Sequence, residues 1–152
     1  MDAPVSPKGD IREVATWRGY VTQVHERKKG DTLGYDGQYR LPSDAVVATL
    51  SVGYGDGLSP ALASARAPVL IGGKRCPLLA VCMDQCFADV TGAACGPGTE
   101  VTFFGRDRQG NFLSSQEVAL YIGNDEGCGL TGALSPRVAR VYGDPGEDPV
   151  TM

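Results

Sequence analysis

The sequence predicts an all-β fold, a Greek-key-like β-barrel that carries two short helices. Glycine and proline are frequent, with 21 and 10 among 152 residues, which is unusual for a helical bundle. The apolar runs are short and are separated by turn residues, the pattern of strands joined by tight connections. The length suits one domain with its own core better than two.

The expected strands follow one another as short, β-prone runs. They are 11–26, 45–52, the pair 68–71 and 74–82 joined by a turn at Gly72-Gly73, 80–90, 100–105 and 137–142. One helix is expected from Ser59, as N-cap before Pro60, to about residue 65. The other begins at Ser114, which forms a capping box with Glu117, and runs to about residue 122. The glycine-rich segments 53–57 and 123–132 are expected to be loops.

The run 80–90 carries the most unusual composition. As a strand it places Cys82, Asp84 and Cys86 on one face, and Met83 and Gln85 on the other. A carboxylate inside an apolar run is costly unless it is paired or hydrogen-bonded. We therefore expect a partner for Asp84 nearby.

Charge and composition exclude several classes of protein. The net charge is −4, and the only basic cluster is 27–29 before a turn, which argues against nucleic-acid binding. No apolar stretch approaches the roughly 20 residues of a membrane span. Residues 1–10 are polar and rich in proline, so we expect a linker or the truncated end of a missing domain there, and a cytoplasmic protein. Residues 143–152 are expected to be a disordered tail.

The five cysteines are an odd number without framework spacing, so reduced thiols are expected. A metal site at Cys82, Asp84 and Cys86 is the alternative. There is no Cys-x-x-Cys pair and His25 is the only histidine, so buried thiols are favoured and no metal is expected.

Several segments occur in an order that is typical of one enzyme family. They are Gly-Tyr at 34–35 with Tyr-Arg at 39–40, Val-Gly-Tyr-Gly-Asp-Gly at 52–57, 77–85 with Cys-Met-Asp-Gln at its end, 101–105, 114–117, and Pro-Arg-Val-Ala-Arg-Val-Tyr at 136–142. Together they resemble the C-terminal β-domain of pyridoxal-phosphate-dependent alanine racemases. The resemblance covers residues 11–142, and the ordered set is far more specific than any one motif.

The resemblance implies a two-domain, homodimeric enzyme of which this chain is one part. In the family an N-terminal (β/α)₈ barrel holds pyridoxal phosphate through a lysine, and the β-domain of one subunit reaches the active site of its partner. No lysine here lies in the family's cofactor motif, and 152 residues hold no eightfold βα pattern. The domain alone is therefore expected to be inactive, with the cofactor bound mainly by the absent N-terminal domain.

The resemblance also assigns roles to four residues. Racemisation requires bases on opposite faces of the α-carbon, and the match makes Tyr35 the second base, which needs a positive charge nearby because free tyrosine has a pKa near 10. Met83 matches the residue whose backbone N–H holds the substrate carboxylate, Asp84 is the acid after it, and Tyr54 matches a tyrosine at the active-site entrance. Without the resemblance, Tyr35 and Tyr54 read as packing aromatics and Met83 as a core residue.

One departure from the family concerns substrate size. The family usually has a tyrosine, in contact with the cofactor phosphate, where this chain has Cys128 or, with one insertion, Gly127. Serine racemases of vancomycin resistance also lack it, so the match leaves alanine and serine open as substrates.

The alternative function, from another class, is that of a non-enzymatic β-barrel module that binds a partner protein. Separately, Arg40 is expected to form an ion pair with Asp36 or Asp44.

Overall fold

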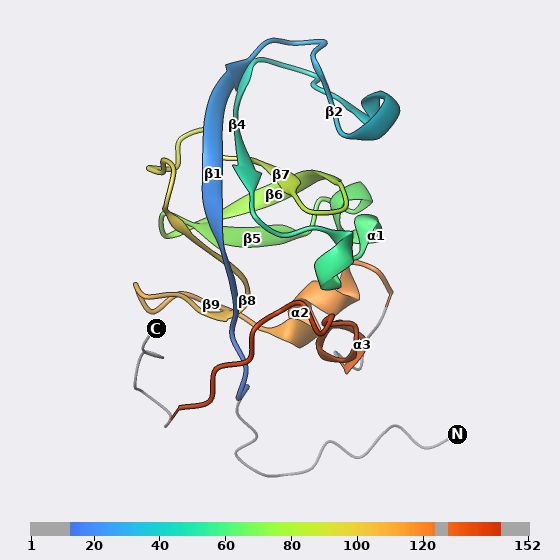
Figure 1. The fold of residues 1–152 in the computed structure, drawn as a ribbon. Helices are drawn as coiled ribbons and strands as arrows, with labels where there is room; N and C mark the ends of the chain where they lie inside the picture. The colour runs from blue at the N-terminus through green and yellow to red at the C-terminus, as the bar shows by residue number, and fades with distance from the viewer. Residues whose placement is uncertain (1–12, 124–127, 144–152) are drawn as a thin grey trace, which may run out of the picture.

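The protein is mostly β-sheet with a few short helices, as expected, in a computed structural model that describes residues 13–123 and 128–143 (Figure 1). The strands are β1 Trp17–Arg27, β2 Thr32–Leu33, β3 Tyr39–Arg40, β4 Ala45–Leu50, β5 Pro68–Ile71, β6 Lys74–Val81, β7 Cys86–Asp89, β8 Glu100–Arg106 and β9 Phe112–Leu113. The helices are η1 Tyr35–Gly37, η2 Tyr54–Asp56, α1 Pro60–Ser64, α2 Ser115–Leu120 and α3 Cys128–Gly132, where η denotes a 3₁₀ helix.

The antiparallel main sheet curls round on itself. Its order is β1-β4-β7-β6-β5-β8-β9, and β8 also pairs with β1. The long strand β1 therefore pairs with β4 on one side and with β8 on the other, while β5 and β8 share only two residue pairs. The short β2–β3 hairpin stands apart and carries η1 at its tip.

The β5–β6 hairpin forms where the sequence predicts it. Ile71 pairs with Lys74 across Gly72 and Gly73, whose φ angles are 56° and 74°. Two positive φ angles define the turn that matches the twist of a tight hairpin, and glycine adopts them without strain.

Both predicted N-caps are confirmed. Ser59 Oγ accepts a hydrogen bond from the Ala61 N–H, and Ser114 Oγ accepts one from the Glu117 N–H at 3.0 Å. The capping box at Ser114 is only half formed, because the Glu117 carboxylate binds Arg75 on β6.

The prediction of one strand over 80–90 is wrong. β6 ends at Val81, residues 82–85 form a turn in which the Cys82 N–H donates to the Gln85 carbonyl at 2.8 Å, and β7 begins at Cys86. The carboxylate of Asp84 is 65% exposed, so the turn avoids burying its charge. The strand face proposed for Cys82, Asp84 and Cys86 does not exist.

Four further expectations need correction. Residues 137–142 form no strand, and part of the expected loop 123–132 is helix α3, while 124–127 lie outside the described residues. The first strand begins at Trp17, with 13–16 irregular and 11–12 not described. Arg40 donates to the Gly30 carbonyl at 2.9 Å rather than pairing with Asp36 or Asp44, and Asp44 pairs with Lys28. The linker at 1–10 and most of the tail at 143–152 lie outside the described residues.

The core lies between the strands and α1 and α2. Trp17 packs in a tilted arrangement against Phe103, with 5.1 Å between ring centroids, and against Phe104, which is 1% exposed. A smaller apolar cluster supports the β2–β3 hairpin; it consists of Leu33, Leu41, Val47, Leu79 and Ala80. This second cluster fixes the position of η1 relative to the sheet.

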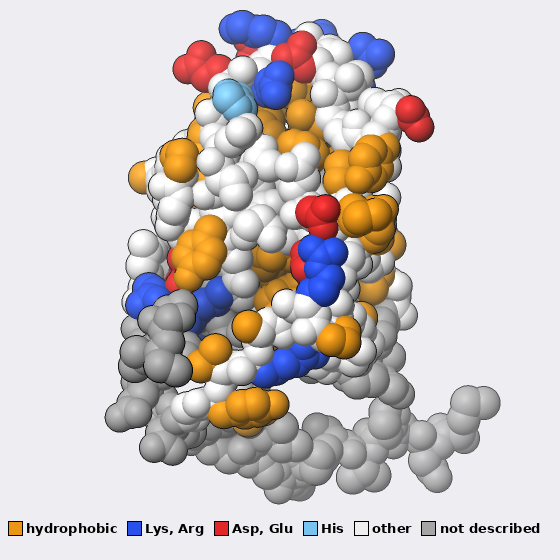
Figure 2. All heavy atoms as spheres, viewed as in Figure 1, with side chains coloured by type: hydrophobic (Ala, Val, Ile, Leu, Met, Phe, Trp, Pro, Cys, Tyr) orange, Lys and Arg blue, Asp and Glu red, His pale blue; other side chains and the backbone are white. Residues whose placement is uncertain are grey.

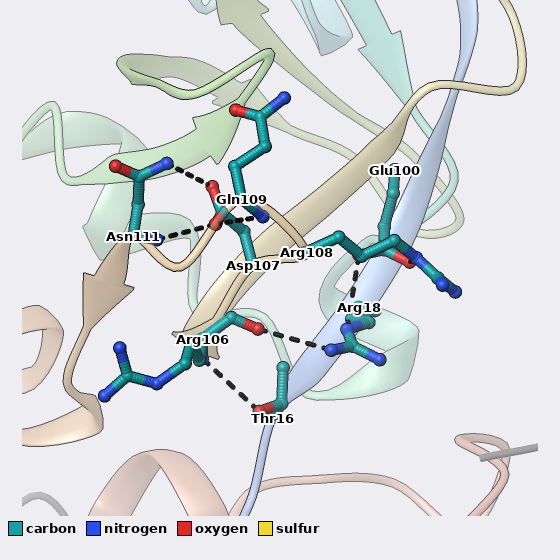
Figure 3. Close-up of polar contacts among 8 residues, drawn as sticks. All are labelled: Thr16, Arg18, Glu100, Arg106, Asp107, Arg108, Gln109 and Asn111. Atoms are coloured by element: carbon teal, nitrogen blue, oxygen red, sulfur yellow. Dashed lines mark hydrogen bonds and ion pairs between the residues drawn. The ribbon is translucent and has the colours of Figure 1, made fainter. Parts of the chain in front are cut away.

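Polar contacts order the β8–β9 turn at the far end of the molecule (Figure 3). The Asp107 carboxylate accepts hydrogen bonds from the backbone N–H groups of Gln109 and Asn111, at 2.9 and 2.8 Å. Glu100 binds both Arg18 and Arg108. The polar groups of the turn therefore bond to one another, and we assign the turn a structural role.

Buried thiols are found at Cys76, Cys82 and Cys86. Within the described residues, no three histidine, cysteine or acidic side chains are grouped to hold a metal ion. None of the described helices has the length and apolar character needed to cross a membrane.

Candidate functional site

Three turns from distant parts of the chain meet at one edge of the sheet and bring three predicted site residues together. Tyr35 lies on η1, Tyr54 on η2 and Met83 on the turn between β6 and β7. The backbone N–H of Met83 donates to the hydroxyl oxygen of Tyr35 at 3.3 Å. Tyr54 interacts with the Tyr35 hydroxyl as well; burial first, and then this neighbour, raise the pKa of Tyr54.

Glycines place the Tyr35 side chain clear of the sheet. Gly34 has a φ of 78°, and a Cβ there would come within 3.1 Å of the Ala80 Cβ. Gly37 has a φ of 67°, and Asp36 itself has a φ of 52°, a conformation that costs energy for a residue with a side chain. The hairpin thus holds an energetically unfavourable backbone that projects Tyr35 outward.

The η2 turn is locked to the turn at 82–85 by backbone contacts. The Tyr54 N–H donates to the Cys82 carbonyl and the Gly55 N–H to the Met83 carbonyl, both at 2.9 Å. A Cβ on Gly53 would lie 2.3 Å from both of those carbonyl oxygens, so only glycine fits there. The glycine pattern that excluded a regular strand therefore allows two turns to pack backbone against backbone.

Asp84 meets the partner that its charge requires. The Arg137 guanidinium donates to the Asp84 carboxylate at 2.7 Å and lies 3.4 Å from that of Asp56. Asp56 in turn accepts the Gly53 N–H at 2.9 Å. Sequence reasoning missed Arg137; the signal was the expected need of Asp84 for a partner, but nothing local identified that partner 53 positions away.

The site presents apolar side chains to the surface. Tyr35 is 50% exposed, Met83 46% and Tyr54 42%. Figure 2 shows hydrophobic side chains gathered beneath the β2–β3 hairpin, beside neighbouring acidic and basic groups. A cluster of exposed aromatic and apolar groups is typical of a surface that another protein covers.

A groove of about 370 Å³ lies next to this edge, between β3, α1 and β6. Its walls include Arg66, which has a φ of 54° and whose guanidinium binds the Tyr39 hydroxyl. Tyr35, Tyr54 and Met83 are not among its lining residues, so the groove is separate from the three-turn site.

Two positions were considered for the tyrosine that the family usually has. Gly127 and the side chain of Cys128 both lie outside the described part of the chain.

Comparison with known proteins gives the family of the chain. Residues 14–142 match the family described as alanine racemase, C-terminal domain. The chain is 41% identical over 132 residues to an alanine racemase of Deinococcus deserti, covering 86% of this chain and 36% of that protein. A relative from Deinococcus radiodurans is 40% identical over 134 residues, covering 88% and 36%. The chain thus spans about a third of the length of these curated relatives.

Solved structures share the fold. The chain matches the alanine racemase of Bacillus anthracis with bound L-Ala-P at a TM-score of 0.76 and 31% identity, covering 87% of this chain and 33% of that one. It matches a histidine racemase of Leuconostoc mesenteroides subsp. sake at a TM-score of 0.71 and 26% identity, covering 83% and 33%. The match over most of the chain, together with the meeting of the motif residues at one edge, shows that this chain belongs to the alanine racemase C-terminal domain family.

Proposed function

We propose that this chain is the C-terminal domain of a pyridoxal-phosphate-dependent racemase that interconverts L- and D-alanine. In the complete homodimer its Tyr35 exchanges a proton with the substrate in the partner subunit's active site. The observation that carries the proposal is the contact between the Tyr35 hydroxyl oxygen and the Met83 N–H at 3.3 Å. The contact supports the proposal because a phenol oxygen and a backbone N–H, the groups needed to accept a proton and to bind a carboxylate, lie side by side.

Tyr35 is suited to proton transfer at the α-carbon. Its hydroxyl accepts a bond from a neutral N–H, and it stands on a hairpin whose glycines direct it away from the sheet. Because free tyrosine has a pKa near 10, a tyrosine that acts as a base at neutral pH needs a cation nearby. Arg137, a cation beside this edge, is engaged by Asp84 and Asp56. We therefore expect the activating charge to come from the absent domain.

Met83 is suited to hold the substrate carboxylate through its main chain. Its N–H points at the Tyr35 oxygen, so a carboxylate oxygen that replaced this contact would bring the adjacent α-carbon close to the phenol. Tyr54, beside both groups, would line the way in, and Asp84 follows Met83 on the same turn. Because the donor is the backbone N–H, the methionine side chain needs no hydrogen-bonding group to bind a carboxylate.

The residues of this edge fit the substrate end of a pyridoxal phosphate site. They offer a phenol and a backbone N–H, which suit proton transfer and carboxylate binding. No lysine is among them, since the described lysines are Lys28, Lys29 and Lys74, outside the three turns. The cofactor, when bound, stabilises negative charge on the α-carbon. Its lysine and phosphate contacts would belong to the N-terminal (β/α)₈ barrel domain.

Mutation of Tyr35 in the complete enzyme tests this function. Tyr35→Phe keeps the ring and removes the oxygen, so racemisation is expected to fall about 10²–10⁴-fold in both directions, the usual loss for a positioned base. Cofactor absorbance is expected to persist. Tyr20→Phe, on an exposed tyrosine of β1, is the matched control. Turnover of Tyr35→Phe within a few-fold of wild type would contradict the role.

The isolated chain provides an independent test. It is expected to racemise neither alanine nor serine, and to give no stoichiometric adduct with pyridoxal phosphate on borohydride treatment. A stoichiometric adduct on this chain would overturn the assignment of cofactor binding to the absent domain. A gene that encodes this domain without a barrel domain would favour the non-enzymatic interaction module instead.

A second candidate substrate is serine, as in the branch linked to vancomycin resistance. A small residue at 127 or 128 in place of a tyrosine removes a phenol from the pocket wall, and a histidine racemase among the structural neighbours has this fold with a named substrate larger than alanine. An apolar pocket rejects an added hydroxyl only about 10²-fold. Kinetics with L-alanine and L-serine on wild type and Cys128→Tyr test it. Strong alanine preference, unchanged by the tyrosine, would exclude the widened pocket.

A further inference from the structure

Arg137 connects two of the three turns of the site, and neither the resemblance nor the family match gives it a role. It comes from the irregular segment that follows α3. Its guanidinium donates to Asp84 on the turn after β6 and lies 3.4 Å from Asp56 on η2. One side chain therefore bridges the carboxylates of two turns that are 28 positions apart in the sequence.

The bridge lies directly against the backbone that carries Met83. A Cβ added to Gly55 would lie 2.6 Å from an Arg137 guanidinium nitrogen, so the guanidinium fills the space beside that glycine. The Gly55 N–H donates to the Met83 carbonyl at 2.9 Å. Arg137 is held in place in turn, because the Ser135 N–H donates to the Asp56 carbonyl at 2.9 Å and the Arg137 N–H to Ser135 Oγ at 3.2 Å. Arg137 thus supports the η2 turn, whose Gly55 N–H bonds the Met83 carbonyl.

The bridge also changes the charge beside the Met83 N–H. Asp84 is the next residue, its carboxylate is 65% exposed, and its negative charge acts on the neighbouring Tyr54 hydroxyl. A substrate carboxylate at the Met83 N–H would meet this like charge. Where a partner subunit covers this edge, repulsion between two carboxylates a few ångströms apart is substantial, and a cation bonded to one of them offsets it.

We propose that Arg137 is a positioning residue for substrate binding: it holds the Met83 N–H in place and masks the charge of Asp84 from the substrate carboxylate. This inference rests on the proposed function, because it assumes that a carboxylate binds at Met83. It acts on binding rather than on proton transfer, since its contacts are with Asp84, Asp56 and the turn that carries Met83.

The test uses the complete enzyme with Arg137→Met, Arg137→Lys, Asp84→Asn and the double variant Arg137→Met/Asp84→Asn. Arg137→Met is expected to raise KM for L-alanine about 10-fold or more, with kcat changed much less, because a charge-assisted bond is lost and Asp84 is unmasked. Arg137→Lys restores the charge and is expected to recover part of the loss. Arg75→Met, which breaks a comparably exposed ion pair with Glu117, is the control.

The double variant separates charge from simple anchoring. Because Asp84→Asn removes the repelling charge, it is expected to bring KM of Arg137→Met back to within a few-fold of wild type. Amide hydrogen exchange of peptides covering 53–57 and 82–85 gives a second readout, expected to quicken in Arg137→Met and not in Arg75→Met. Unchanged KM and exchange in Arg137→Met would overturn the role, and a double variant no better than Arg137→Met would overturn charge masking. A wild-type enzyme without racemase activity would instead overturn the proposed function.

Discussion

Aromatic residues are buried in the interior of the barrel but exposed at the three-turn edge. Trp17, Phe103 and Phe104 are at most 5% exposed and contact one another on regular strands. Tyr35 and Tyr54 are about half exposed and stand on 3₁₀ turns with glycines on each side. The first set stabilises the fold by burial, whereas the second set gains little from burial in this chain.

Under the proposed function, this difference separates residues that stabilise the fold from residues that would act on the substrate. An exposed tyrosine on a hairpin with a left-handed Asp36 contributes little to folding, and its backbone costs energy. Its position is explained when another protein surface and a substrate cover it. Substitutions in the barrel interior are therefore expected to cost stability, whereas substitutions at the edge are expected to cost activity.

Phe104→Ala is expected to have the largest effect on stability. Phe104 is 1% exposed and packs against Trp17, so its truncation leaves a cavity and is expected to lower the free energy of unfolding by about 3–5 kcal/mol. Urea denaturation of the chain followed by tryptophan fluorescence measures this. Tyr35→Ala, of similar chemistry at the edge, is the comparison and is expected to change stability little. Equal losses in the two variants would break the distinction between the regions.

Gly53→Ala is expected to affect both properties, because this glycine lies where the edge is anchored to the sheet. Its new Cβ would lie 2.3 Å from two carbonyl oxygens, which forces the turns apart at a cost of about 1–3 kcal/mol. Racemase activity in the complete enzyme is expected to fall as well, since the Met83 N–H moves. The control is Gly96→Ala, where an added Cβ meets nothing within 4 Å. Wild-type stability and activity in Gly53→Ala would rule out close packing of the two turns.

The smallest expected effect concerns pH and the Arg75–Glu117 pair of the barrel. The hydrogen bond from Arg75 lowers the pKa of the Glu117 carboxyl in the folded protein. Its contribution is therefore present above the ordinary pKa of glutamate and is lost as pH falls through the lowered value. Both side chains are more than a third exposed, so it is expected to be below about 1 kcal/mol. Unfolding of wild type and Arg75→Met between pH 3 and about pH 7 measures it; identical pH profiles would show that the pair contributes nothing.

Local signals predicted the parts of the fold that depend on local physics. Gly72-Gly73 set a hairpin turn, and Ser59 and Ser114 capped helices, because each acts on its own neighbours through φ angles or a single hydrogen bond. The turn at 82–85 was missed because its apolar neighbours resemble a strand. Its partner Arg137 lies 53 residues away, beyond any local pattern.

The site was predictable in a different way. Local patterns alone predict that Tyr35 is a packing aromatic and Met83 a core residue. The resemblance to a family assigns both to one site, although they are 48 positions apart in the sequence. In the structure the Met83 nitrogen lies 3.3 Å from the Tyr35 hydroxyl oxygen. The alternation of apolar and polar residues at 137–142 is typical of a paired strand, but no strand forms there. In the fold the backbone of 135 and the side chain of Arg137 bind η2 instead, and no strand edge is paired there.

Complementation between two inactive full-length subunits tests the central claim most directly. One subunit carries Tyr35→Phe and the other a substitution of the lysine that is proposed to hold the cofactor in the N-terminal domain. If Tyr35 serves the partner subunit's site, each mixed dimer contains one site with both defects and one with none. Random mixing of equal amounts is then expected to restore about a quarter of wild-type activity. If each tyrosine served its own subunit, every site in the mixed dimer would keep one defect, and an inactive mixture would contradict the account.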